Sequence, residues 1–94
     1  MPTVQFAWDR RKAAKNLKEH GVSFEEAVTV FGDPLARIHD DPEHSIGEHR
    51  ELIVGHSTSQ QLLLVFFTER GEAVRIISAR QADAGERHDY EEIF

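Results

Sequence analysis

The amino-acid sequence predicts an α+β fold in which helices pack on one antiparallel sheet. Two observations support this class. Residues 10–31 carry apolar side chains at helical spacing between capping residues, whereas residues 62–80 form two apolar segments joined by Gly71-Glu72. Two apolar segments separated by a two-residue turn are typical of a β-hairpin. The chain has 94 residues, 39% of them hydrophobic, so we expect one modest core and one domain over residues 1–94.

The N-terminal region is predicted to begin with a strand and a helix. Residues 4–8 alternate weakly between apolar and polar side chains, as in a short strand. Asp9 is a suitable N-cap for a helix over residues 10–20, and Gly21 is well placed to end that helix in a left-handed conformation. The apolar residues of this helix form a thin stripe, which consists of Ala13, Ala14 and Leu17.

A second helix is predicted to begin after Ser23, which starts a capping box with Glu26. Apolar residues at helical spacing follow, and Gly32-Asp33-Pro34 ends the helix. Residues 35–38 are predicted to form a short strand. Residues 39–47 are polar and contain Pro42 and Gly47, so we expect an exposed loop.

The C-terminal half is predicted to form a three-stranded antiparallel meander followed by a helix. Residues 49–56 alternate in polarity, residues 61–68 form a continuous apolar run, and residues 74–79 follow the tight turn. The continuous run indicates a central strand that is buried on both faces. Asp83 then caps a last helix that extends to about residue 92. With the N-terminal strand, the meander would complete one sheet covered by the two N-terminal helices.

Composition limits the classes of function. The formal net charge of −6 argues against tight nonspecific RNA binding, which depends on positive charge. All lysines nevertheless lie between Lys12 and Lys18, beside Arg10 and Arg11, so a locally basic surface is compatible with the acidic total. The chain has no cysteine, no apolar run long enough to span a membrane and no recognisable signal peptide. We therefore expect a cytoplasmic protein.

Three arginines stand close to the apolar strands, with Arg70 at the hairpin, Arg75 inside the second strand and Arg80 at its end. The guanidinium group binds phosphate through a planar fork of donors, which points toward RNA chemistry. The alternative is salt bridging with the 17 acidic residues of the chain. Strict alternation places Arg75 and Arg80 on opposite faces, so they can converge only if the strand ends or bulges near Ser78.

Three further residues are candidates for proton transfer. His20 ends the first predicted helix, where the helix dipole favours a cation, and an imidazole can act as acid or base near neutral pH. Glu48 could accept a proton while Arg50 holds phosphate, or the two could form an ordinary surface ion pair. Tyr90 lies three residues after Arg87 on the last helix and is either an aromatic residue at the edge of the core or a proton donor.

A histidine-rich acidic segment contains residue types that can bind a metal ion. It contains His39, Asp40, Asp41, Glu43, His44, Glu48 and His49. Their spacing matches no metal-binding motif of known geometry, so we expect neither a metal ion nor a cofactor.

Several short segments, taken together and in order, carry a resemblance to a known family. They are Phe6-Ala7-Trp8-Asp9, Lys12 with Asn16, His20-Gly21-Val22-Ser23-Phe24, Val30-Phe31 with Asp33-Pro34, Gly47-Glu48 with Arg50, Val65-Phe66-Phe67-Thr68-Glu69-Arg70, Ile76-Ile77-Ser78-Ala79-Arg80, and Glu86-Arg87 with Tyr90-Glu91. Through these segments the sequence resembles the BrnT family of type II toxins, which adopt a RelE-like fold. The resemblance covers essentially the whole chain.

The resemblance implies a RelE-like endoribonuclease that inhibits translation. It also implies neutralisation by a BrnA-like antitoxin with a ribbon-helix-helix domain, and contact with operator DNA only through that antitoxin. RelE-like ribonucleases need no metal ion. The ribose 2′-hydroxyl attacks the adjacent phosphorus and leaves a 2′,3′-cyclic phosphate and a free 5′-hydroxyl.

On this mechanism the candidate residues divide into two groups. The catalytic candidates are Arg80 and Arg70 at the phosphate, Glu48 or His20 as proton acceptor, and Tyr90 or His20 as proton donor. The candidates for substrate phosphate binding are Arg50, Arg75 and Lys18. Two alternatives remain: a noncatalytic corepressor whose arginines and apolar sheet edge bind an antitoxin, which the acidic net charge favours, and a metal hydrolase that uses residues 39–49.

Overall fold

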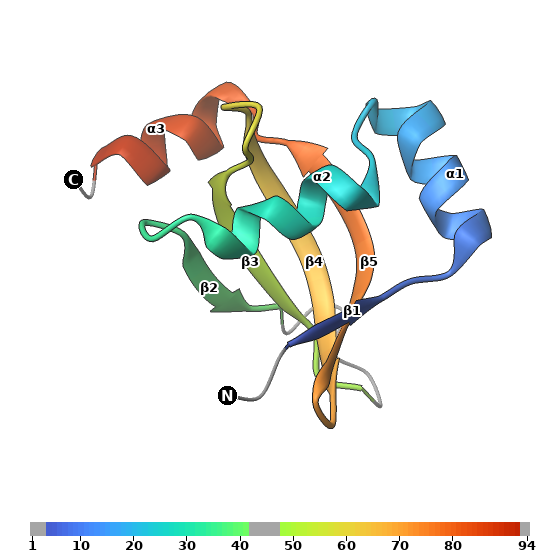
Figure 1. Ribbon diagram of the computed structural model, residues 1–94. Coiled ribbons are helices and arrows are strands. Elements are labelled where there is room, and N and C mark those ends of the chain that lie inside the picture. Colours follow the sequence, from blue (N-terminus) through green and yellow to red (C-terminus); the bar gives the residue numbers. More distant parts are fainter. Residues whose placement is uncertain (1–3, 42–47, 93–94) are drawn as a thin grey trace.

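A five-stranded sheet with the order β1-β5-β4-β3-β2 organises the fold (Figure 1). The computed structural model describes residues 4–41 and 48–92. The strands are β1 (Gln5–Ala7), β2 (Arg37–Asp40), β3 (Glu51–His56), β4 (Leu62–Arg70) and β5 (Ala73–Gln81). The helices are α1 (Arg10–His20), α2 (Phe24–Thr29), the 3₁₀ turn η1 (Val30–Gly32) and α3 (Ala84–Glu92). The predicted α+β class is confirmed.

The sheet is mixed, whereas the sequence predicted an antiparallel one. β3, β4 and β5 form the predicted antiparallel meander, and β2 pairs antiparallel with β3, for which no partner was predicted. β1 runs parallel to β5, with Gln5 opposite Ala73. The direction of β1 depends on how α1 and α2 carry the chain across the sheet, which local residue patterns do not encode. β2 also begins later than predicted, because the backbone N–H groups of Leu35 and Ala36 donate to Asp33 and form a turn there.

α1 and α2 begin where their capping residues predict. The carboxylate of Asp9 accepts hydrogen bonds from the N–H groups of Arg11 and Lys12, at 2.8 and 3.0 Å. Gly21 has φ +70° and donates its N–H to the carbonyl of Leu17, which ends α1. The predicted helix over residues 10–20 is therefore confirmed at both ends.

The capping box of α2 is half formed. The Ser23 hydroxyl accepts the N–H of Glu26 at 3.0 Å, as predicted. The Glu26 carboxylate, however, accepts a hydrogen bond from the buried hydroxyl of Ser57 at 2.8 Å. This bond joins α2 to the turn between β3 and β4.

One hydrophobic core lies between α2 and the face of the sheet that this helix covers. It is built from residues of the α1–α2 connection, α2, η1 and the three central strands: Val22, Phe24, Ala27, Val30, Ile53, Leu63, Val65, Phe67, Val74, Ile76 and Ala79. Trp8 and Phe6 pack against this core through ring contacts with Phe24 and Phe31. Among the described residues, no helix is long and apolar enough to cross a membrane.

α1 is attached to the sheet mainly by a polar residue, because only Ala13 of its predicted apolar stripe packs against the core, while Ala14 and Leu17 are exposed. β1 pairs only with residues 73–75, so the second half of β5 has α1 beside it in place of a strand. The buried Asn16 side chain donates to the carbonyls of Ala79 and Val22 at 2.8 and 2.9 Å, and it accepts the N–H of Ala79 at 3.0 Å. Leu17, predicted to face the core, is 52% exposed.

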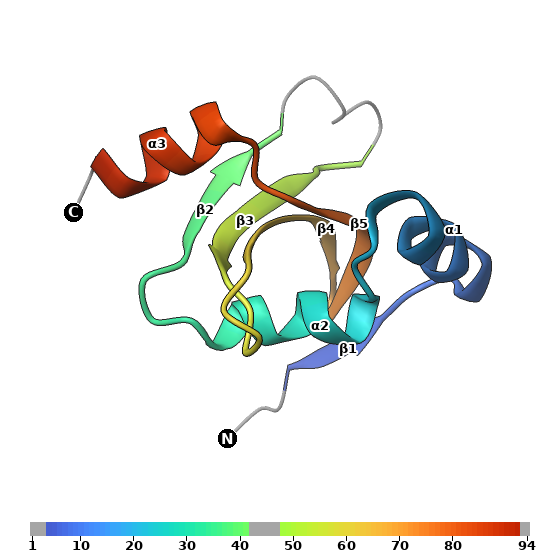
Figure 2. The ribbon, with the colours of Figure 1, turned by 90° about the horizontal axis from the view of Figure 1, so that it is seen from above.

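α3 covers the opposite side of the sheet from α2, as the view from above shows (Figure 2). Its predicted cap is confirmed, because Asp83 Oδ1 accepts the N–H of Glu86 at 2.8 Å and Glu86 Oε1 accepts the N–H of Asp83 at 2.9 Å. Near its other end, the Tyr90 hydroxyl donates to the carbonyl of Leu35 at 3.1 Å. These two contacts fix the two ends of the helix.

Replacing Asn16 with alanine is expected to lower the free energy of unfolding by about 2–4 kcal/mol, because two carbonyls and one N–H would lose their partners. Urea denaturation followed by circular dichroism measures this change. The control is Leu17→Ala on the exposed side of the same helix, which should change stability by less than about 0.5 kcal/mol. Equal losses in the two variants would show that the amide hydrogen bonds have no special role.

Candidate active site

A β-bulge in β5 sets the direction of its side chains. Phe66 is opposite Ser78, but Phe67 is opposite Ile76, so Ile77 is an extra residue without a partner on β4. A one-residue insertion reverses the alternation of side chains beyond it. The condition under which Arg75 and Arg80 could share a face, a bulge near Ser78, is therefore met.

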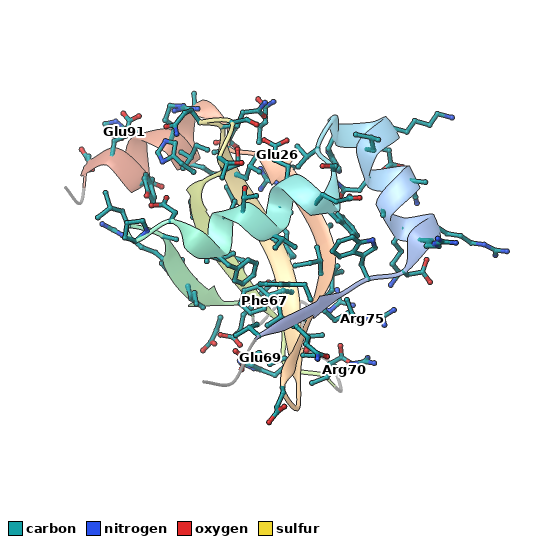
Figure 3. All side chains as sticks on the ribbon, in the orientation of Figure 1. Glu26, Phe67, Glu69, Arg70, Arg75 and Glu91 are labelled. Carbon is teal, nitrogen blue, oxygen red and sulfur yellow. The ribbon has the colours of Figure 1, made fainter. Side chains whose placement is uncertain are left out.

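The register shows which face the two arginines share. Arg75 is opposite Thr68 and Arg80 is opposite Leu64, and these β4 residues are four apart. Both arginines therefore project from the face of the sheet opposite α2, which is called the outer face below. Arg75 lies toward the hairpin end of β5, two residues after Ala73, which is opposite Arg70 (Figure 3).

A cleft of about 310 Å³ lies between α1 and the sheet at the bulge. The helix residues that line it are Lys12, Lys15, Asn16, Glu19 and His20, and the sheet residues are Arg50, Ile77 and Ser78. A smaller hollow of about 140 Å³ shares the three sheet residues and extends to Asp41 and Phe66. The structure thus brings together His20 and Arg50, two of the residues predicted from the sequence.

Two lysines of this cleft, Lys12 and Lys15, are not among the site residues predicted from the sequence. The signal that could have revealed them is the spacing of Lys12, Lys15 and Glu19, which places them on one face of α1 together with Asn16. The apolar residues of α1 instead indicate a different buried stripe. Lys18, the lysine that was predicted, is exposed in the last turn of α1 and does not line the cleft.

Glu48 lies close to the cleft but has Arg70 as its hydrogen-bond partner. Arg70 Nη2 donates to Glu48 Oε2 at 2.6 Å. This hydrogen bond is the main reason why the pKa of Glu48 is lowered, while the charge of Arg50 contributes less. Glu48 is thus held as a carboxylate, and its low pKa makes it a weaker base.

Arg80 forms a bidentate ion pair with Glu86 at the start of α3. The two hydrogen bonds measure 2.7 Å from Nη1 to Oε1 and 2.8 Å from Nη2 to Oε2. They are the main cause of the shift of the Glu86 pKa to about 2, and they raise the pKa of Arg80. The guanidinium fork that the sequence suggested for phosphate therefore binds a carboxylate, which offers a similar pair of oxygens.

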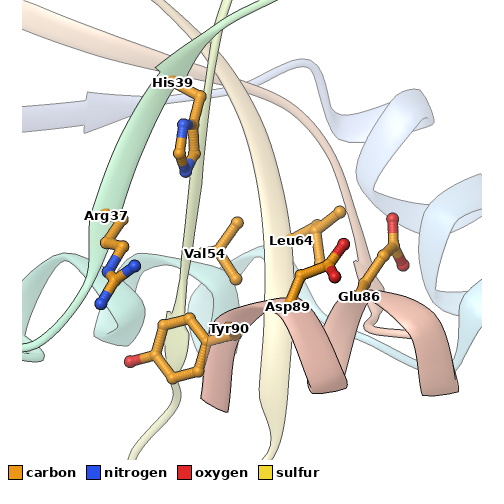
Figure 4. A pocket seen from close by; sticks show the side chains of 7 residues that line it. All are labelled: Arg37, His39, Val54, Leu64, Glu86, Asp89 and Tyr90. Carbon is orange, nitrogen blue, oxygen red and sulfur yellow. The ribbon is translucent and has the colours of Figure 1, made fainter. Parts of the chain in front are cut away.

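Tyr90 lies at a different site, under α3. A pocket of about 250 Å³ there is lined by Arg37, His39, Val54, Leu64, Glu86, Asp89 and Tyr90 (Figure 4). Tyr90 is 7% exposed, and the centroid of its ring lies 5.6 Å from the Arg37 guanidinium carbon and 5.7 Å from the centroid of the His56 ring. Burial raises the pKa of Tyr90. This pocket shares no lining residue with the cleft of His20 and Arg50.

Two other candidates from the sequence, Arg75 and the acidic histidine segment, have surroundings that differ from those of the cleft residues. The charge of Arg75 contributes to a lowered pKa of Asp9, although the backbone hydrogen bond from Lys12 is the larger cause. In the acidic histidine segment, one ligand atom each of Asp40, His49 and Glu51 lies within 4.8 Å of the others. His39 instead lines the pocket under α3, and the predictions for Glu43 and His44 fall outside the described residues.

Comparison with known proteins places the chain in a family. A family model described as the ribonuclease toxin BrnT of type II toxin–antitoxin systems matches residues 8–86. The 1.1 Å crystal structure of the Brucella abortus ribonuclease toxin BrnT is 23% identical in sequence and superposes with a TM-score of 0.67, over 86% of this chain and 99% of that one. No curated protein sequence matches the chain.

The crystal structure shares the fold, and the family model spans both the cleft and the bulge of β5. The resemblance inferred from the sequence segments is confirmed. Because the family model covers most of its length, the chain belongs to the BrnT family of ribonuclease toxins of type II toxin–antitoxin systems.

Proposed function

We propose that this BrnT family member cleaves RNA without a metal ion, by attack of the ribose 2′-hydroxyl on the adjacent phosphorus, in the cleft between α1 and β5. Family membership supplies the ribonuclease activity. The observation that carries the assignment of the cleft is that His20 and Arg50 line it together with two lysines. Proton transfer and phosphate binding are the two tasks of this reaction, and the cleft contains side chains for both.

The cations of the cleft match the charge that develops in the reaction. Attack by the 2′-oxygen adds negative charge to the phosphate, and preorganised cations that meet this charge often supply the largest share of catalysis. In our proposal Arg50 contacts the reacting phosphate, while Lys12 and Lys15 bind neighbouring phosphates along the RNA. This local cluster explains how a chain of net charge −6 can bind RNA at one place.

Proton transfer is assigned to His20, with Glu48 as a second candidate. An imidazole can accept the 2′-hydroxyl proton or donate a proton to the 5′-oxygen near neutral pH. Glu48 is ionised and lies near Arg50, so its carboxylate could accept the 2′ proton while His20 protonates the leaving group. The hydrogen bond from Arg70 then holds Glu48 in place.

Two further candidates, Arg80 and Tyr90, act in this mechanism by exchanging contacts. Arg80 can bind phosphate after releasing the Glu86 carboxylate, and Tyr90 can donate a proton after leaving the Leu35 carbonyl. Arg75 and Lys18 are retained as contacts to RNA outside the reacting phosphate.

Purified protein is expected to cleave RNA in the presence of EDTA and to leave 5′-hydroxyl ends. His20→Ala should lower the rate about 10²–10⁴-fold through loss of proton transfer, and Arg50→Ala about 10²–10³-fold through loss of charge stabilisation. Arg87→Ala is the control, because Arg87 forms an exposed ion pair on α3, remote from the cleft lining.

Loss of cleavage in EDTA, or full activity of either folded variant, would contradict the proposal. Absence of cleavage on both free RNA and ribosome-bound mRNA would favour the noncatalytic corepressor.

The role of Arg80 can be tested by changing its partner. If Arg80 exchanges Glu86 for phosphate, Glu86→Gln removes the competing charge and should lower the KM for RNA several-fold, whereas Arg80→Ala should raise it. Glu91→Gln serves as the control, since Glu91 pairs with Arg87 on the exposed side of α3. Unchanged kcat and KM in folded Arg80→Ala would restrict Arg80 to anchoring α3.

In this proposal residues 1–94 act as one RelE-like domain in the cytoplasm, inhibit translation and are neutralised by a BrnA-like ribbon-helix-helix antitoxin that also contacts operator DNA. A type II toxin implies a cognate antitoxin. We expect a short adjacent reading frame whose product copurifies with the toxin and blocks RNA cleavage. If the product of the adjacent reading frame neutralises the toxin but has another fold, the ribbon-helix-helix assignment is wrong, while the proposed ribonuclease activity stands.

A further inference from the structure

We propose that Asp40, His49 and Glu51 form a binding site for a divalent first-row transition metal ion, for which Zn²⁺ is the probe. One ligand atom from each side chain lies within 4.8 Å of the other two. The site lies where β2 and β3 pair at one end, and none of its residues lines the proposed catalytic cleft. It is therefore an accessory site, and cleavage does not depend on it.

The backbone brings the three ligands together. Asp40 and Glu51 are directly opposite each other on antiparallel neighbours, and His49 precedes Glu51 by two residues. The Asp40 Oδ1 and His49 Nε2 atoms are 3.1 Å apart. Two ligands of a tetrahedral zinc ion with bonds of ~2.1 Å are separated by ~3.4 Å, so this pair already has nearly the required spacing.

The side chains can complete the site without disturbing the core. Those of Asp40 and His49 are 72% and 63% exposed, so rotation of either requires no repacking. The carbonyl of His49 is held by a hydrogen bond from the Thr68 hydroxyl at 2.7 Å, which fixes the backbone of this ligand against β4. Water can fill the remaining coordination positions.

The charges of the site favour a cation. Two carboxylates directly opposite each other on neighbouring strands repel, and a bound divalent ion converts that repulsion into attraction. One imidazole with two carboxylates suits Zn²⁺ and related ions better than Ca²⁺ or Mg²⁺, which prefer oxygen ligands alone. Because the ion links β2 to β3 only in the folded chain, its binding should stabilise the fold.

His39 provides a matched control. It precedes Asp40 on β2, but alternation turns it to the outer face, where it lines the pocket under α3. Both His39 and His49 are exposed histidines near the same end of the sheet, and they differ in the face they occupy. If Zn²⁺ bound the histidine-rich surface in general, His39→Ala and His49→Ala would both weaken binding. The proposed site requires His49 but not His39.

The test is titration of tag-free, EDTA-treated and dialysed protein with Zn²⁺ by isothermal calorimetry, together with the Tm at saturating Zn²⁺. Wild type and His39→Ala should bind one ion with similar affinity and gain thermal stability. His49→Ala should bind at least about tenfold more weakly and gain none, as should Asp40→Asn or Glu51→Gln. Circular dichroism without metal confirms that each variant is folded.

Wild-type affinity in His49→Ala, an equal loss in His39→Ala, or no binding by wild type would each overturn the site. RNA cleavage in EDTA is a separate measurement, so this inference and the proposed ribonuclease mechanism can fail independently.

Discussion

The candidate active site depends on the hydrogen bonds that the Asn16 side chain makes between α1 and the sheet. β1 is too short to cover the second half of β5, and the amide of Asn16 binds both polar backbone groups of Ala79 in place of a strand. The same side chain holds the carbonyl of Val22, just after the helix ends. The buried amide makes three hydrogen bonds in all. Because hydrogen bonds are directional, they set the position of α1 relative to the sheet. His20 and the two lysines of the cleft are placed by this contact.

The bulge at Ile77 is the second constraint, and it acts next to the first. An extra residue between Ile76 and Ser78 changes which side chains of β5 reach the outer face. Ala79 remains in the core, so the strand can present its backbone to Asn16 while Ser78 opens to the cleft and Arg80 reaches Glu86. The two irregular features thus define one site where helix, strand and outer face meet.

Acidic side chains bind two of the arginines that lie near the sheet. Glu48 binds Arg70, and Glu86 binds Arg80 through a bidentate pair. Because of this pairing, Arg70 and Arg80 lie near the sheet without creating a large positive field. RNA phosphates would compete with these carboxylates for the guanidinium groups of Arg70 and Arg80.

The sequence by itself determined the features that depend on neighbouring residues. The caps at Asp9, Ser23 and Asp83 and the helix end at Gly21 rest on hydrogen bonds that span two to four residues, and all were predicted. The hairpin turn at Gly71, with φ +60°, is local in the same sense. The motif segments also identified the family, because they are spread in order along the chain.

The tertiary structure decided the features that depend on distant partners. The parallel direction of β1 and the burial of Asn16 follow from contacts between residues more than 60 positions apart. Local patterns suggested that Leu17 would be buried, since an apolar side chain is the usual choice, and only the open edge of β5 explains why an amide replaces it. The site of His20, Arg50 and the lysines could not be read from the sequence, because its position depends on how a helix, a bulge and a third strand pack together.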